Sequence, residues 1–308
     1  MQELLQSLKD NISKKFIGRD ETIHNIVVAL LAGGHVLIED VPGVGKTTLA
    51  KAVAGSIDAS FARIQFTPDT LPTDVTGTSV FDPVKTEFKT VLGPIHNQII
   101  LADEINRTSP RTQSALLEAM EEKQVTIDGK AFDLPELFMV IATENPSEHL
   151  GTYQLPEAEL DRFMMKVSIG YPNKSKQTLL AKNYLEGALD EKLTPVLKPE
   201  QVLEMREAVK NVIIKDELIE YALKIVDDTR SLSELEYGLS PRAGLALLAA
   251  SRANAYLKGR DYVIPEDIIE MADVTLPHRL VLTAKAYMER YTGEQLITRV
   301  VDKIKLPE

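Results

Sequence analysis

The chain has 308 residues, of which 44% are hydrophobic and 26% are charged, which is enough for two domains that share a ligand site. It has no cysteine, which excludes disulfide scaffolds, thiolate metal sites and a cysteine nucleophile. The formal net charge is −11, and residues 1–172 hold 15 basic against 24 acidic groups. This acidic excess disfavours a sequence-independent grip on nucleic acid or on an anionic membrane.

The chain shows no sign of a membrane segment. Its longest apolar run, residues 26–38, is interrupted by two glycines and a histidine, and it is too short to cross about 30 Å of hydrocarbon. The first residues carry scattered charges and lack the apolar centre of a signal peptide. We therefore expect a cytoplasmic protein that does not insert into membranes.

Short apolar runs alternate with helix-like stretches in the first half of the chain. The runs are residues 35–39, 63–66, 99–102, 138–142 and 164–167. This alternation predicts an α/β fold in which a five-stranded parallel sheet is covered by helices on both faces. Ligands of such sheets bind at the carboxyl ends of the strands.

Two further segments predict β-hairpins. Residues 124–127 and 130–132 flank Asp128-Gly129, a strong hairpin signal, and residues 79–81 and 87–91 flank a turn that contains proline. After Pro172 the strand signals stop, and apolar residues recur at helical spacing. We therefore expect an α/β domain over residues 1–172 and a separate all-α bundle over residues 173–308.

The run Gly43-Val44-Gly45-Lys46-Thr47-Thr48 follows a predicted strand and opens a predicted helix. Backbone N–H groups in this setting cradle phosphates, so Lys46 can reach the β- and γ-phosphates of ATP and the Thr47 hydroxyl can hold Mg²⁺. The strict pattern has glycine where this chain has Asp40, whose carboxylate would repel a triphosphate unless it points away. The alternative is a glycine-rich turn without a ligand.

A second pair of residues belongs to the same edge of the sheet. The apolar run 99–102 leads directly into Asp103-Glu104, which places two carboxyl groups at the end of a buried strand. Asp103 suits a metal-holding role, and Glu104 is placed to polarise a water for attack on the γ-phosphate. Two acids that merely begin the next helix are the alternative.

Longer motifs then occur in order along the chain. They are Asp103-Glu104-Ile105-Asn106-Arg107, residues 113–121, Ala142-Thr143-Glu144-Asn145-Pro146, residues 155–163, Ser240-Pro241-Arg242 and residues 278–283. Together they resemble the MoxR family of AAA+ ATPases. The resemblance implies an AAA+ core with hairpin insertions, followed by a helical lid.

The resemblance also implies roles for single residues. Asn145 would be the first sensor, orienting the attacking water, and Arg242 the second sensor, folding back over the triphosphate. Arg162 would reach the γ-phosphate of the neighbouring subunit. Pro42 to Thr48 and Ile17 would bind the nucleotide, with Ile17 lining the adenine pocket. The plainer alternatives are an asparagine-proline turn, a solvated arginine, a salt bridge from Arg162 to Asp161 or Glu159, and ordinary core packing of Ile17.

The family further implies a homo-hexamer that binds ATP and Mg²⁺ and matures or activates other proteins, commonly with a partner that carries a von Willebrand factor A domain. The hairpin at 79–91 would project toward the pore of the ring. Two other functions stay open at this point. One is a nucleotide-gated scaffold with little turnover, in which Asp40 spoils the loop, and the other is a nucleic-acid motor, which the charge of the first half disfavours.

Overall fold

The computed structural model describes residues 2–146, 152–189 and 191–307. Its centre is a five-stranded parallel sheet in the order β2-β5-β8-β1-β9. The strands are β1 (Val36–Glu39), β2 (Phe61–Gln65), β5 (Ile99–Asp103), β8 (Met139–Glu144) and β9 (Met165–Val167). Each of the five apolar runs forms one of these strands, so the predicted sheet is confirmed.

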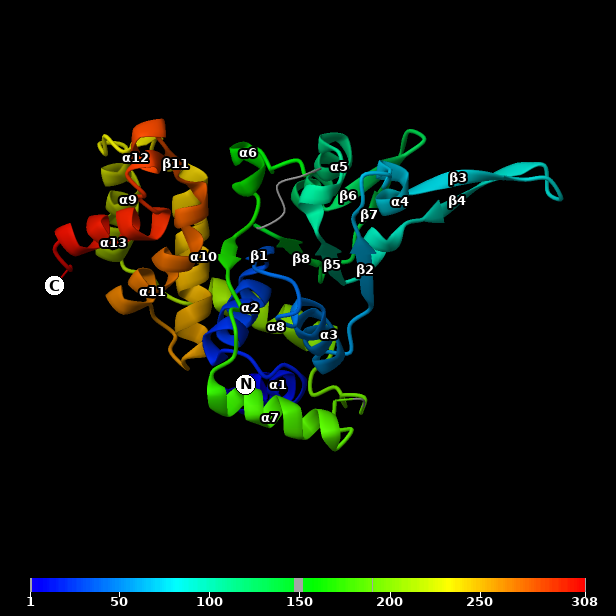
Figure 1. Ribbon diagram of the computed structural model, residues 1–308, viewed down its shortest axis with the longest axis horizontal. Coiled ribbons are helices and arrows are strands. Elements are labelled where there is room, and N and C mark those ends of the chain that lie inside the picture. Colours follow the sequence, from blue (N-terminus) through cyan, green and yellow to red (C-terminus); the bar gives the residue numbers. More distant parts are fainter. Residues whose placement is uncertain (1, 147–151, 190, 308) are drawn as a thin grey trace.

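Both faces of this sheet are covered by helices, as Figure 1 shows. One face carries α1 (Gln2–Lys15), α2 (Asp20–Ala32) and α3 (Lys46–Ser56), and the other carries α4 (Pro72–Thr76), α5 (Pro110–Glu122) and α6 (Glu157–Leu160). Alternate strand residues supply the two hydrophobic clusters: Leu101 packs into the first and Ile100 into the second. A strand that is buried on both faces has to be apolar almost throughout, as β5 is, whereas β2 at the edge of the sheet is only partly buried.

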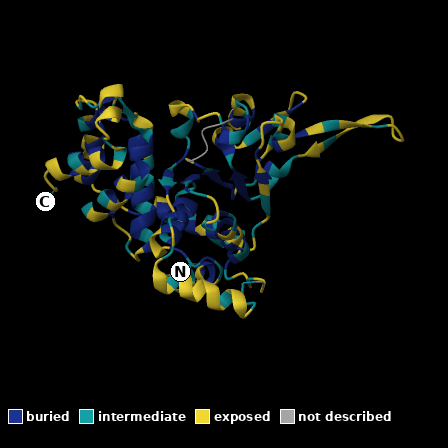
Figure 2. Cartoon of the chain, viewed as in Figure 1, coloured by how far each residue is buried: buried dark blue, intermediate teal, exposed yellow. Residues whose placement is uncertain are grey.

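Two hairpins are inserted into this core, as predicted. They are β3 (Gly77–Asp82) with β4 (Glu87–Leu92) and β6 (Gln124–Ile127) with β7 (Lys130–Asp133). The β3–β4 hairpin extends far from the body of the protein, and most of it is exposed (Figures 1 and 2). Phe81 and Phe88 face each other across its strands with ring centroids 5.3 Å apart.

The second half of the chain is helical. Its helices are α7 (Lys174–Leu185), α8 (Pro199–Lys210), α9 (Asp216–Thr229), α10 (Pro241–Leu257), α11 (Pro265–Thr275), α12 (Ala284–Met288) and α13 (Gly293–Lys303). A small antiparallel ribbon of β10 (Leu235–Tyr237) and β11 (Val281–Leu282) lies among them. Of the short 3₁₀ turns in the described residues, η3 (Pro277–Arg279) lies in this half, while η1 (Pro94–His96) and η2 (Ile105–Arg107) lie in the first half. Strands of two or three residues are too short to show a period in the sequence.

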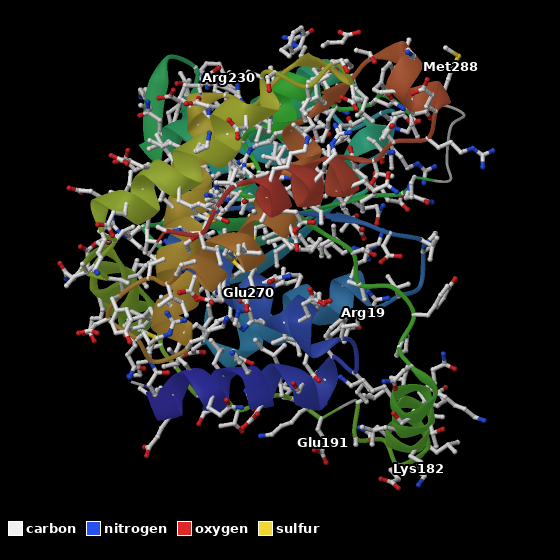
Figure 3. All side chains as sticks on the ribbon, turned by 90° about the vertical axis from the view of Figure 1, so that its left-hand side faces the viewer. Arg19, Lys182, Glu191, Arg230, Glu270 and Met288 are labelled. Carbon is white, nitrogen blue, oxygen red and sulfur yellow. The ribbon has the colours of Figure 1, made fainter. Side chains whose placement is uncertain are left out.

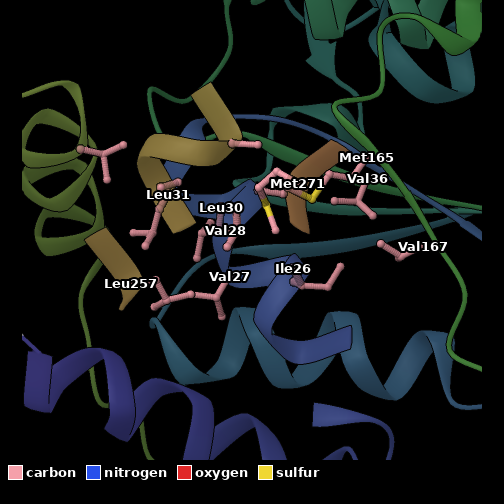
Figure 4. Packing of buried hydrophobic residues seen from close by; sticks show 14 of the residues in the cluster. Ile26, Val27, Val28, Leu30, Leu31, Val36, Met165, Val167, Leu257 and Met271 are labelled. Atoms are coloured by element: carbon pink, nitrogen blue, oxygen red, sulfur yellow. The ribbon is translucent and has the colours of Figure 1, made fainter. Parts of the chain in front are cut away.

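The helical half packs against α2 and the β9 edge of the sheet. Figure 4 shows Ile26 and Leu30 of α2, Val36 of β1, Met165 of β9 and Met271 of α11 in one cluster. The helix α8 also rests on α2, where Arg206 Nε donates to the Leu30 carbonyl at 2.8 Å. The boundary at residue 172 therefore stays a prediction, because α8 lies beyond it and yet contacts the α/β half.

Among the described helices after residue 172, α7 differs from the others because none of its residues is buried. Figure 3 shows it standing out from the body, with Lys182 exposed. Lys176 Nζ ties it to the Gly18 carbonyl at 2.6 Å and to the Asp20 carboxylate at 2.7 Å. Throughout the described ranges, every helix is too short or too polar to span a bilayer.

Candidate active site

The predicted phosphate loop lies at the carboxyl edge of the sheet, between β1 and α3. Gly43 and Gly45 adopt φ values of 85° and 97°, in the left-handed region that favours glycine. Gly45 caps α3 without any side-chain hydrogen bond, and the first turn of α3 has no acidic residue. The start of this helix therefore keeps N–H groups available for an anion, as a phosphate site requires.

Lys46 is buried at this edge, and its ammonium group is directed between two strands. Its Nζ donates to the Asp40 carbonyl at 2.5 Å and to the Glu144 carbonyl at 3.0 Å. Burial lowers the pKa of Lys46, while the carboxylates of Asp40, Asp103 and Glu104 act in the opposite sense. Lys46 therefore lies close enough to Asp103 and Glu104 for their charges to act on its ammonium group.

The carboxylate of Asp40 points away from the loop. Its Oδ2 accepts hydrogen bonds from the backbone N–H groups of Ile169 and Gly170, at 2.8 and 2.6 Å, and from the Ser168 hydroxyl at 3.0 Å. Burial raises the pKa of Asp40, but these hydrogen bonds and that from the Val41 N–H outweigh it, so the pKa is lowered overall. Asp40, which stands where the strict loop pattern has glycine, therefore joins the end of β1 to the segment after β9.

Asp103 is the last residue of β5 and Glu104 follows it, as predicted, and Thr143 of β8 links them. The Thr143 hydroxyl donates to Asp103 Oδ1 at 2.7 Å and accepts from the Glu104 N–H at 2.8 Å. Glu104 has φ 59°, so the chain turns sharply just after the buried strand.

Both carboxylates have further partners. Arg63 pairs with Asp103 Oδ2 at 2.6 Å. Gln65 Nε2 and Arg107 donate to Glu104 Oε2 at 2.8 and 3.0 Å. A carboxylate has about four lone-pair sites, so Asp103 can still accept a metal-bound water or a metal. Oxygen donors from Thr47 and Asp103 are the kind that Mg²⁺ prefers, and these residues fit the predicted ion.

Asn145 follows β8 and is 3% exposed. Together with Asn106, Glu39 and Glu144 it lines a cavity of about 360 Å³. Burial raises the pKa of Glu144 to about 7, and the nearby Glu39 adds to the shift while Lys166 and Lys46 oppose it. Asn145 thus lies at the carboxyl edge of the sheet, where it lines the same cavity as Glu39 and Glu144.

Ile17 is half-buried in the segment between α1 and α2. The ring of its neighbour Phe16 lies against the phosphate loop, where a Cβ added at Gly45 would be 3.5 Å from it. The segment that carries Ile17 therefore lies beside the loop, as an adenine pocket requires.

Arg162 and Arg242 lie together at the opposite end of the strands, where the strands begin. We call this side of the sheet the amino edge, and the side with the phosphate loop the carboxyl edge. Both form ion pairs with Glu121 of α5, at 3.4 and 2.9 Å, so the partner of Arg162 is neither of the two acids considered from the sequence. They line a cavity of about 310 Å³ with Gly34 and Met164, which precede β1 and β9. No residue of the phosphate loop is among its described lining residues.

The position of Arg242 differs from the one expected. It does not lie over its own phosphate loop, because α10 packs on α2 and the β9 edge and so places the start of α10 beside Arg162. The strand β1 has four residues, so its two ends lie roughly 13 Å apart. Arg242 and the phosphate loop therefore lie at opposite edges of the sheet.

Sequence reasoning missed several polar side chains around these sites: Arg63, Gln65, Glu121, Thr143 and Arg279. Thr143 lay inside a motif that was recognised, yet its bridging role depends on pairing between β5 and β8. Arg63 and Gln65 alternate along β2, and this polar alternation on a strand of a buried sheet was the available signal.

Comparisons with known proteins give the family of this chain. Residues 35–165 match the family described as "ATPase family associated with various cellular activities (AAA)", and residues 227–300 match an AAA lid domain. Chaperone MoxR1 of Mycobacterium tuberculosis is 40% identical over 96% of this chain and 81% of its own length. The chain belongs to the MoxR family of AAA+ ATPases.

Other relatives of this MoxR-family chain cover nearly all of it. Uncharacterized protein YeaC of Bacillus subtilis is 46% identical over 99% of this chain and 95% of its own length. A solved structure from Cytophaga hutchinsonii, described as that of a candidate ATPase, matches with a TM-score of 0.94 and 36% identity, over 100% of this chain and 96% of the other.

Proposed function

We propose that this protein hydrolyses ATP in a ring of identical subunits, each site being completed by the next subunit, and that it uses the cycle to remodel partner proteins. The observation that carries the proposal is the division of its charged groups between two edges of the sheet. Lys46, Asp103 and Glu104 lie at the carboxyl edge, while Arg162 and Arg242 lie at the amino edge.

The carboxyl edge has the parts of a hydrolytic site. The N–H groups at the start of α3 and the Lys46 ammonium would hold the phosphates of ATP. Thr47 and Asp103 would hold Mg²⁺, which would neutralise part of the phosphate charge. Glu104 would accept the proton of the attacking water, which requires its carboxylate to turn from Gln65 and Arg107. The Asn145 amide would orient that water.

The amino edge has two arginines that could complete the nucleotide site of an adjacent subunit. Arg162 and Arg242 have side chains that are 27% and 46% exposed, and both pair with one carboxylate, Glu121. In a head-to-tail ring, the amino edge of one subunit can face the carboxyl edge of the next. An arginine supplied from a neighbour is worth about 10³–10⁵ in rate in GTPases. We therefore assign Arg162 and Arg242 to the nucleotide of the adjacent subunit, in a homo-hexamer.

Mixing two inactive variants tests this assignment. Lys46→Ala and Arg162→Ala should each be nearly inactive, because one lacks the phosphate contact and the other the arginine. In a mixture, a subunit with intact Lys46 can use the arginine of a Lys46→Ala neighbour, so ATPase activity should return in part. A mixture that stays as inactive as its components would contradict a shared site.

The β3–β4 hairpin is the part of the protein to which we assign contact with a client protein. Val84 and Phe88 are 91% and 74% exposed on it, which gives an extended apolar surface away from the nucleotide site. We propose that this hairpin projects toward the ring pore and contacts a partner chain, with a von Willebrand factor A protein as a cofactor in remodelling. A cytoplasmic location follows from the proposal, and nucleic acid is not expected as the substrate.

A further inference from the structure

The turn that carries Arg162 is held by the helical half of the same subunit. Arg279, in the 3₁₀ turn η3 of the second half, lies with its Nε 2.7 Å from Asp161 Oδ1. Its NH2 donates to the Asp161 carbonyl at 3.3 Å and to the Phe163 carbonyl at 2.8 Å. One guanidinium group therefore contacts the residues on both sides of Arg162.

This contact is built as a buried clamp. The Arg279 side chain is 4% exposed, and Phe163 is fully buried in the core beneath α5. Burial lowers the pKa of Arg279 to about 10 and Asp161 opposes the shift, so the side chain stays cationic at neutral pH. The planar fork of arginine can bond a carboxylate and carbonyls at once, which a lysine cannot do.

A second contact ties the same turn to the other predicted arginine. The Ser240 hydroxyl, at the start of α10, donates to Asp161 Oδ2 at 3.2 Å. Two residues later Arg242 pairs with Glu121, which also binds Arg162. The amino-edge arginines are thus fixed to the lid from η3 and from α10, while no described contact of Arg279 involves residues 42–48.

We propose that Arg279 is a positioning residue that couples Arg162 to the lid, so that movement of the lid on one subunit moves the arginine that serves the next subunit's nucleotide. This rests on the proposed function, because it assumes that Arg162 acts in trans. Arg279 itself would contact no nucleotide, and its effect would pass through the geometry of the turn at residues 161–163.

Complementation between variants tests the assignment. Arg279→Gln should lower the kcat for ATP by about 10²-fold, as a displaced catalytic group does, with little change in KM. Mixed with Lys46→Ala, which supplies an intact Arg162, it should regain activity to the level of the Arg162→Ala plus Lys46→Ala mixture. Mixed with Arg162→Ala it should regain none, because both variants then lack a working arginine.

Two further variants separate positioning from general stability. Arg279→Lys keeps a cation beside Asp161 but loses the fork, so it should behave like Arg279→Gln and carries the test if the glutamine variant does not fold. Arg299→Gln is a matched control, because it removes a lid arginine from an ion pair of the same 2.7 Å length, with Glu234. Its kcat should stay within about twofold of native, whatever its loss in Tm.

The outcomes are distinct. If Arg279→Gln recovers with Arg162→Ala but not with Lys46→Ala, Arg279 serves the nucleotide of its own subunit and the coupling is refuted. An Arg279→Gln protein that loses Tm but keeps native kcat would show a purely structural role. If the Arg162→Ala and Lys46→Ala reference mixture is itself inactive, the shared site fails and this inference fails with it.

Discussion

Glu144→Gln should stabilise the protein near neutral pH and not in mild acid. Glu144 and Glu39 are register partners at the ends of β8 and β1. Burial, with the nearby Glu39 charge, raises the pKa of Glu144 from 4.5 to about 7, against the opposing charges of Lys166 and Lys46. A raised carboxyl pKa means that the folded state binds the proton more tightly than the unfolded chain does. The free energy of unfolding therefore falls as the pH rises from about 4.5 to about 7.

The size of the effect follows from the shift. One pKa unit corresponds to about 1.4 kcal/mol, so ionised Glu144 costs the folded state on the order of 3 kcal/mol above pH 7. Glutamine has nearly the same shape and carries no charge, so Glu144→Gln removes this cost.

Thermal unfolding of both proteins between pH 5 and pH 8 measures it. The stability gain of Glu144→Gln over native should grow through this range and level off above pH 7. Glu118→Gln, a change at an exposed position of α5, should show no such trend. A gain that is equal at pH 5 and pH 8 would refute the reasoning.

Two substitutions in and before the phosphate loop, Asp40→Gly and Gly45→Ala, are compared with Gly55→Ala as a control. Asp40→Gly should lower the free energy of unfolding by about 2–4 kcal/mol, because the Ile169 and Gly170 N–H groups lose their acceptor, and it should leave ATP turnover near native. Since the pKa of Asp40 is lowered, the difference in the free energy of unfolding between native protein and Asp40→Gly should shrink as the pH falls through that pKa. Higher ATP turnover without loss of stability in Asp40→Gly would contradict the structural role of Asp40. Gly45→Ala should cost about 1–2 kcal/mol, because φ is 97°, and should weaken ATP binding in a nucleotide titration. Gly55→Ala, later in α3, where a Cβ would make ordinary van der Waals contact with Leu193 at 3.8 Å, should instead add about 0.5–1 kcal/mol. Equal effects at the two positions would contradict the strained loop.

Much of the α/β half could be predicted from the sequence, because its signals are local. A parallel strand is buried on both faces and reads as an apolar run, as in residues 99–102. The Asp128-Gly129 hairpin follows from two adjacent residues with positive φ, at 49° and 77°. The order of loop, strand and acids placed Lys46, Asp103 and Glu104 at one edge without any knowledge of distant contacts.

The remaining features depend on contacts between segments far apart in the chain. The position of Arg242 is decided by how α10 packs on α2, and no local pattern in α10 reports that. Asp40 was recognised as a departure from the loop pattern, but the N–H groups that donate to its carboxylate lie about 130 residues away, at Ile169 and Gly170. Arg279 likewise acquires its contacts only when η3 meets the turn at Asp161.

Comparison of ATP turnover in native protein and in Glu104→Gln tests the central claim most directly. The account predicts that native protein hydrolyses Mg²⁺-ATP, and that Glu104→Gln still binds ATP through the loop and Lys46 but releases phosphate at least about 10²-fold more slowly. Native protein that binds ATP without turnover, or a Glu104→Gln variant as active as native, would contradict a hydrolytic site at the end of β5.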